Sequence, residues 1–185
     1  MPVKSRAHFL WVLLLPLAAL LTIGAEATPE IQAYRLAITI KAPAEFLYPY
    51  LVDENKVARW ARDDSTEISF PRGPETRVGK QILIRVKVMT HPWILLEITR
   101  LVPNREVVTR FVDGMLAGDF AYQLTPQADG STVFTQEMRI QPVGSVTTVL
   151  WKVLGEKLYH DKMWKYMKNL KVIGEADWQA AQAGR

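Results

Sequence analysis

Few residues in this 185-residue sequence could take part in acid–base chemistry, and His160 is the first candidate. The chain has three histidines and no cysteine; His8 lies in the N-terminal segment 1–27, which leaves His91 and His160. An imidazole changes charge near neutral pH, so His160 could act as a general acid or base, or could anchor the polar end of a ligand. The alternative is a structural histidine whose ring bonds to Glu156, one helical turn earlier.

Lys157 and Gln136 are further polar candidates. Lys157 lies at the edge of the same helical stripe as His160, where its ammonium could pair with a carboxylate or phosphate of a lipid. The alternative for Lys157 is ordinary surface exposure. Gln136 shares a strand face with Phe134 and Met138, so it could meet a buried polar group.

Two charged strand residues leave their orientation open. Arg110 shares one face of its strand with Val108 and Val112, but Val107 and Phe111 make the opposite face equally apolar. Glu97 poses the same question within the apolar segment 93–101. Arg110 is therefore a candidate for the interior or for the surface, and the pattern does not decide between them.

The composition excludes several classes of function. Without cysteine, the chain has no disulfides, thiolate metal sites or cysteine nucleophiles. It has no HExxH, GxSxG or phosphate-binding glycine loop, so we expect neither a metal nor a cofactor. Residues 28–185 contain 21 basic and 18 acidic residues. This mild excess does not suggest nucleic-acid binding.

The N-terminal segment predicts export. Lys4 and Arg6 precede an uncharged apolar run from Phe9 to Gly24, and Ala25-Glu26-Ala27 fits the small-residue rule for signal peptidase. We expect residues 1–27 to be a signal peptide and the mature chain to be periplasmic or secreted. The alternative is an uncleaved anchor in the inner membrane, but the run is shorter than the roughly 20 residues of a spanning helix, and Pro16 interrupts it.

Alternating apolar and polar residues predict seven short strands, and helical spacing predicts two short helices and one long one. The strands are expected near 34–41, 66–70, 82–88, 93–101, 106–112, 119–124 and 133–140. The short helices are expected within 44–51 and 53–62, and the long helix at about 145–173. Gly174 would end the long helix, so a frayed tail is expected at 175–185.

The long helix has an apolar stripe that should cover one face of the sheet. At about 100° per residue, the stripe consists of Val146, Val149, Leu150, Val153, Trp164 and Met167, and His160 falls near its middle. Its lysines, at 152, 157, 162, 165, 168 and 171, are spread around the helix and are mostly expected to face solvent; weak attraction to anionic lipid headgroups is the alternative. Met115 and Leu116, in a short loop, could form a ligand gate or membrane contact, or could pack under the domain.

The segments TIKAPAEFLYPYLVDENKVARW and YQLTPQADGSTVFTQEMRI, in this order before a long closing helix, resemble the SRPBCC superfamily. This superfamily includes START domains, birch-pollen allergens and polyketide cyclases/dehydrases. The resemblance runs from about Tyr34 to Ile173. It implies an α+β helix-grip fold, in which a curved antiparallel sheet of about seven strands wraps around the C-terminal helix. The expected domain is 28–174.

The resemblance also implies an apolar cavity between sheet and helix, where a hydrophobic ligand would bind. The candidate ligand-binding residues are His160, Lys157, Val153, Trp164, Met167, Gln136, Phe134, Met138, Arg110 and Tyr122. Three functions remain open: a carrier of a hydrophobic, lipid-like molecule, a cyclase/dehydrase-like enzyme with His160 as acid or base, and an accessory interaction protein with a filled core. No second acid–base residue pairs with His160 by spacing, which favours the carrier over the enzyme.

Overall fold

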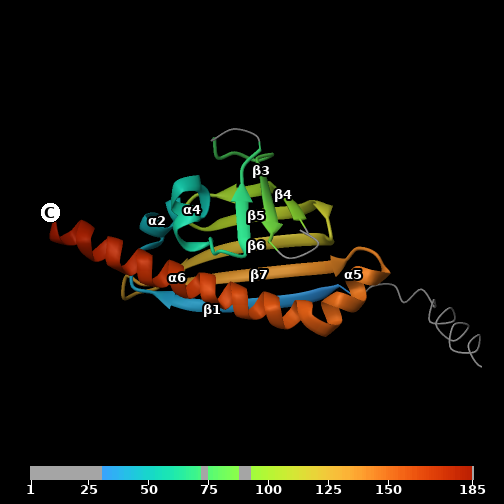
Figure 1. Cartoon of the computed structure of the whole chain (residues 1–185). Helices are drawn as coiled ribbons and strands as arrows, with labels where there is room; N and C mark the ends of the chain where they lie inside the picture. Colours follow the sequence, from blue (N-terminus) through green and yellow to red (C-terminus); the bar gives the residue numbers. More distant parts are fainter. Residues whose placement is uncertain (1–30, 72–74, 88–92, 185) are drawn as a thin grey trace, which may run out of the picture. The chain divides into compact units, whose positions relative to one another are not determined.

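The computed structural model describes residues 31–71, 75–87 and 93–184 (Figure 1). The fold described below is that of the unit Ile31–Arg185. The predicted export signal and His91 lie outside the described residues. Within the described ranges, no helix is both long and apolar enough to cross a membrane.

Seven antiparallel strands form one sheet in the order β1-β7-β6-β5-β4-β3-β2. Their bounds are β1 Gln32–Ile40, β2 Thr66–Ser69, β3 Gln81–Val86, β4 Trp93–Val102, β5 Glu106–Gly114, β6 Leu116–Pro126 and β7 Thr132–Pro142. Five of the connections join neighbouring strands, and β1 pairs with β7 to complete the order. The sheet and the long C-terminal helix that packs against it confirm the predicted α+β helix-grip fold.

Three short helices, one more than predicted, follow β1: α2 Ala44–Leu47, α3 Pro49–Val52 and α4 Glu54–Trp60. Pro49 lacks an amide hydrogen and therefore separates α2 from α3. Asp53 caps α4, because its carboxylate accepts hydrogen bonds from the amides of Asn55 (2.9 Å) and Lys56 (3.1 Å). Figure 1 shows these helices at one end of the sheet, beside the C-terminal part of the long helix.

The long helix has three parts: α5 Ser145–Leu150, a π-helical turn η2 Trp151–Gly155, and α6 Glu156–Ala183. The α6 side chains that pack inward include Tyr159, Met163, Tyr166, Met167 and Leu170. The prediction that the stripe from Val146 to Val153 covers the sheet is wrong, because these residues are exposed. The helix meets the sheet only from Trp151 onward, so its first turns extend into solvent.

The predicted frayed tail is also wrong, because α6 continues through Gly174 to Ala183. Gly174 is buried, and a Cβ at this position would lie 2.9 Å from Leu47 Cδ2, so this glycine allows close packing rather than ending the helix. Beyond it, Asp177 accepts hydrogen bonds from Tyr50 and from Arg59 (2.5 Å), and Trp178 packs on Phe46. These contacts hold the last turns against α2, α3 and α4.

The core consists of two clusters of buried residues. The first, around Trp60, Phe134 and Met167, lies between α6, the sheet and the short helices. The second, around Met138, Phe111 and Trp151, lies towards α5. Tyr122 and Phe120 on β6 join the two, with ring centroids 4.7 Å apart. Leu116 is buried in the second cluster and Met115 packs against it, which agrees with the alternative in which these two residues pack under the domain rather than form a gate or membrane contact.

Candidate functional site

The helix candidates His160 and Lys157 lie on the surface. The His160 side chain is 58% exposed, and its Nδ1 lies 3.9 Å from Asp161 Oδ1. The Lys157 side chain is 82% exposed and forms an ion pair with Asp161 (2.5 Å), one turn further along. Val153 is exposed as well. The prediction that these three residues face the sheet is wrong, because Tyr159 occupies the inward position of this turn.

Strand register places Arg110 and Glu97 opposite each other on the outer face of the sheet. Arg110 is exposed and lies 3.5 Å from Asp119, its partner on β6. The possibility that Arg110 reaches a ligand in the interior is therefore wrong. The inner face of β5 carries Val107, Thr109 and Phe111 instead, all of which are buried.

The remaining candidates lie in the interior. Phe134, Gln136 and Met138 alternate along β7 towards α6 and are buried, and Tyr122 lies beside Gln136 on β6. Met167 is fully buried and Trp164 partly buried. The structure thus brings together six of the ten candidates: Phe134, Gln136, Met138, Tyr122, Met167 and Trp164.

Gln136 belongs to a group of five polar and aromatic side chains, Gln32, Tyr34, Gln136, Trp151 and Tyr159, here called the tyrosine–glutamine cluster. Gln136 Nε2 donates a hydrogen bond to the Tyr159 hydroxyl. Trp151 Nε1 donates to Gln32 Oε1 (2.7 Å) and to the Tyr34 hydroxyl (3.2 Å), and Tyr34 also donates to Gln32. The Tyr34 and Tyr159 rings lie 5.6 Å apart. The cluster fastens the start of the long helix to β1 and β7.

Sequence reasoning missed four members of this cluster. Tyr34 could have been found, because the alternation of the first strand places it on the same face as Leu36 and Ile38. Gln32 lies just before the predicted start of that strand, at Tyr34. Trp151 and Tyr159 could not have been found by helical spacing alone, because the π-helical turn changes the rotation of the helix between them.

The inner face of β3, β4 and β6 near this cluster is apolar and partly exposed. Ile82, Ile84, Ile94 and Phe120 pack against the second core cluster while keeping part of their surface accessible. On the described strands, register places no charged residue on this inner face. Lys80, just before β3, is buried and pairs with Glu54 on α4 at 2.6 Å. The described inner strand face is therefore apolar and carries no charged side chain of its own, and the ammonium of Lys162 on α6 reaches it at Thr66, on the edge strand β2.

Two phenol groups of this interior, those of Tyr122 and Tyr159, have pKa values raised by burial. Burial raises the pKa of Tyr122, and negative charge on Tyr159 or Tyr166 would raise it further. Burial also raises the pKa of Tyr159 and outweighs the hydrogen bond from Gln136. Both phenols are neutral hydrogen-bonding groups at physiological pH.

A set of polar contacts closes the space between α6 and the edge strand β2. Lys162 Nζ donates to Ser65 Oγ (2.8 Å) and to Thr66, and lies 3.6 Å from Asp63 Oδ1. Burial would raise the pKa of Asp63, but hydrogen bonds from Ser65 and the charge of Lys162 together hold it below its usual value. A hollow of about 510 Å³ adjoins these residues on the outside, lined by Ala58, Arg59, Arg62, Asp63, Asp64, Thr66, Glu67 and Lys87.

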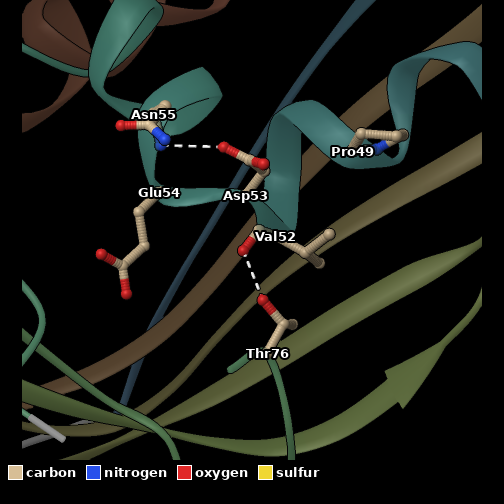
Figure 2. A pocket seen from close by; sticks show the side chains of 6 residues that line it. All are labelled: Pro49, Val52, Asp53, Glu54, Asn55 and Thr76. Carbon is tan, nitrogen blue, oxygen red and sulfur yellow. Dashed lines mark hydrogen bonds between the residues drawn. The ribbon is translucent and has the colours of Figure 1, made fainter. Parts of the chain in front are cut away.

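A second hollow, of about 370 Å³, lies where α3 meets α4 and is lined by Pro49, Val52, Asp53, Glu54, Asn55 and Thr76. Figure 2 shows two of its polar side chains bonded to local backbone: Asp53 accepts from the Asn55 amide, and Thr76 donates to the Val52 carbonyl (2.6 Å). Neither hollow lies at the predicted place between sheet and helix. In the ranges that the structure describes, no three His, Asp or Glu side chains lie close enough together to hold a metal ion.

Comparison with solved structures finds the same fold in proteins of low sequence identity to this chain. TTHA0849 from Thermus thermophilus superposes with a TM-score of 0.62 at 15% identity, over 79% of this chain and 99% of that one. The ZhuI aromatase/cyclase from Streptomyces sp. R1128 gives 0.60 at 12%, over 79% and 94%. Ginseng major latex-like protein 151 from Panax ginseng gives 0.57 at 10%, over 78% and 97%. No family model and no curated protein matches the sequence.

Proposed function

We propose that this protein binds a hydrophobic, lipid-like molecule between the inner face of the sheet and the start of α6. The observation that carries the proposal is the partly exposed apolar surface of Ile82, Ile84, Ile94 and Phe120. Apolar side chains on the concave face of a sheet usually gain stability by complete burial, so surface left accessible there suits an apolar ligand. Helix-grip proteins commonly bind hydrophobic small molecules, which agrees with this assignment.

The tyrosine–glutamine cluster supports a ligand whose polar end is neutral. Because the Tyr159 hydroxyl accepts from Gln136, its own hydrogen can donate to a carbonyl or hydroxyl oxygen of a ligand. The described inner strand face carries no cation, and the ammonium of Lys162 at its β2 edge already contacts Ser65, Thr66 and Asp63. A ligand carboxylate or phosphate buried there would therefore lack a free partner, which is costly. An alcohol, ketone or ester end therefore suits this site better than an acid.

The enzyme hypothesis loses its main support, because His160 is exposed and points away from the apolar surface. Export remains part of the proposal and rests on the pattern of residues 4–27. Exported carriers of apolar molecules work where those molecules cannot cross water unaided. A periplasmic or secreted carrier is consistent with both the signal pattern and the apolar surface.

Native mass spectrometry of the protein isolated from the cells that make it tests this proposal. The expected result is a complex that releases an uncharged apolar molecule on denaturation. Thermal-shift titration with long-chain alcohols, sterols, quinones and diacylglycerols provides a second readout, since a ligand that binds only the native state raises Tm. A protein that carries no apolar molecule, and whose Tm none of these compounds raises, would contradict the proposal.

A further inference from the structure

A contiguous exposed apolar surface lies at the start of the long helix, on the opposite side from its packed face. It consists of Val143, Val146, Val149, Leu150 and Val153, here called the valine surface. These side chains are between 51% and 74% exposed. Isolated exposed valines are normal in soluble proteins, but a contiguous group marks a contact surface.

The local structure holds the valine surface outward. Trp151 is the buried residue in the middle of this segment, fixed by its hydrogen bonds to Gln32 and Tyr34. A Cβ at Gly155 would lie 2.6 Å from the Trp151 ring, so glycine is needed for the ring to pack across the π-helical turn. At the other end, the Val143 amide donates to the Met115 carbonyl (3.0 Å). The segment cannot rotate its valines into the core without losing these contacts.

The chain that precedes the domain joins it beside this surface. Gln32, the first residue of β1, pairs with Ile140 near the end of β7, and its side chain bonds to Trp151. Figure 1 shows α5 at this same end of the sheet, far from the C-terminus. Only residues 25–30 separate the apolar run 9–24 from Ile31. At the reach of an extended chain, they span at most about 25 Å.

The charge of the segment also suits a lipid surface. Between residues 143 and 155 the sequence has one charged residue, Lys152, which is exposed beside Val153. Exposed apolar side chains on one helix face can insert at the interface of a bilayer, and a flanking cation such as Lys152 is attracted to anionic headgroups. This step rests on the export in the proposed function: for as long as the run 9–24 is attached, the short linker keeps this end of the domain within reach of the membrane that the run enters.

We propose that the valine surface docks on an anionic lipid bilayer, with its valine side chains inserted at the level of the headgroups. Trp151 belongs both to this segment and to the second core cluster, so the docked face adjoins the proposed ligand surface. Docking does not require the ligand proposal, because the exposed valines make the contact themselves.

The absence of native cysteine allows single-site labelling. Val149→Cys and the control Val172→Cys each receive an environment-sensitive fluorophore; both valines are strongly exposed, and Val172 lies towards the other end of α6. The protein is used in the form that cells produce, cleaved or not. With vesicles of phosphatidylglycerol and phosphatidylethanolamine, we expect a blue shift for the label at 149 and none for the label at 172.

Substitution provides the second readout. Val146→Ser/Val149→Ser/Val153→Ser should weaken vesicle binding at least tenfold, while Val78→Ser/Val112→Ser/Val172→Ser, which alters exposed valines elsewhere, should change it less than twofold. Circular dichroism and Tm confirm that each variant is folded. The proposal is overturned if neither label responds to vesicles, or if both respond equally. A blue shift at 149 that depends on protein concentration without vesicles would overturn it in favour of a second copy of the chain as the partner.

Discussion

At the scale of residues, Tyr159 and His160 show how neighbouring side chains acquire opposite roles. Tyr159 packs inward and bonds to Gln136, whereas His160 lies in solvent. Regular α-helical spacing from Val146 to Val153 predicts that His160 faces the sheet, because it treats the whole segment as one uninterrupted α-helix. The π-helical turn breaks that assumption, and contacts with β1 and β7 fix the rotation. Neither influence is visible in the spacing of apolar residues.

The first prediction compares substitutions at Gln136 and His160. Gln136→Leu leaves the Tyr159 hydroxyl without its donor in a buried setting, so stability should fall by about 1 to 3 kcal/mol. His160→Gln alters an exposed side chain and should change stability by less than about 0.5 kcal/mol. Urea unfolding of both variants checks this. Equal destabilisation, or a larger loss for His160→Gln, would contradict the assigned orientations.

The second prediction concerns alkaline pH. Burial and Asp177 raise the pKa of Tyr50 to about 12, and burial raises that of Tyr166 to about 12. The unfolded chain loses these protons near pH 10 while the folded chain retains them, so the unfolded state binds fewer protons between about pH 10 and pH 12. Stability from these tyrosines is complete below pH 10 and falls as pH rises towards 12. Urea midpoints across this range measure the decline, and Tyr166→Phe should make it less steep; an unchanged slope would show that Tyr166 does not contribute.

At the scale of elements, the strands were predictable because apolar and polar residues alternate, and all seven were found in the predicted order. The orientation of Arg110 and Glu97 could not be predicted, because both faces of their strands are apolar. Only the pairing between β4 and β5 determines which face turns outward. The end of the long helix was misjudged because Gly174 resembles a terminating glycine. Glycine is instead required at position 174 because Leu47, 127 residues away in sequence, approaches the helix closely there.

A prediction at this scale tests the π-helical turn. Gly155→Ala would place a methyl group 2.6 Å from the Trp151 ring, so the turn must rearrange and stability should fall by about 1 to 3 kcal/mol. Gly184→Ala is the control, because its added Cβ would meet its nearest neighbour at an ordinary 3.7 Å. Thermal unfolding followed by near-ultraviolet circular dichroism of the tryptophans reports both effects. If Gly155→Ala is as stable as the control, the close packing described for Trp151 is wrong.

At the scale of the whole molecule, the fold could be predicted from element order and the resemblance to helix-grip proteins. Which part of the interior is filled by side chains could not. A curved sheet and one helix can enclose a cavity or a filled core, depending on the volumes of side chains that meet from distant segments. Here Trp60, Phe134 and Met167 fill the end near the short helices, while the apolar surface stays accessible near α5. Spacing along one strand or helix does not carry that information.

Export is tested on the whole chain by intact mass. We expect the exported protein to begin at Thr28, because Ala25-Glu26-Ala27 provides the small residues that signal peptidase requires. An Ala27→Tyr variant should block this cleavage and leave the precursor in the membrane fraction. Full-length unmodified protein found only in that fraction would instead show that the run 9–24 is a retained anchor.

The most direct test of the proposed function is titration with two ligands of equal chain length, hexadecanol and hexadecanoate, at neutral pH. Tm and tryptophan fluorescence report binding, and Ile84→Trp, which fills the inner surface, is compared with Val112→Trp on the exposed side of β5. The proposal predicts that the alcohol binds at least about tenfold more tightly than the acid, a difference of about 1.4 kcal/mol, and that only Ile84→Trp weakens it. Equal affinities would contradict only the claim that the polar end of the ligand is uncharged. No rise in Tm and no fluorescence change with either compound would contradict the binding of a lipid-like molecule itself.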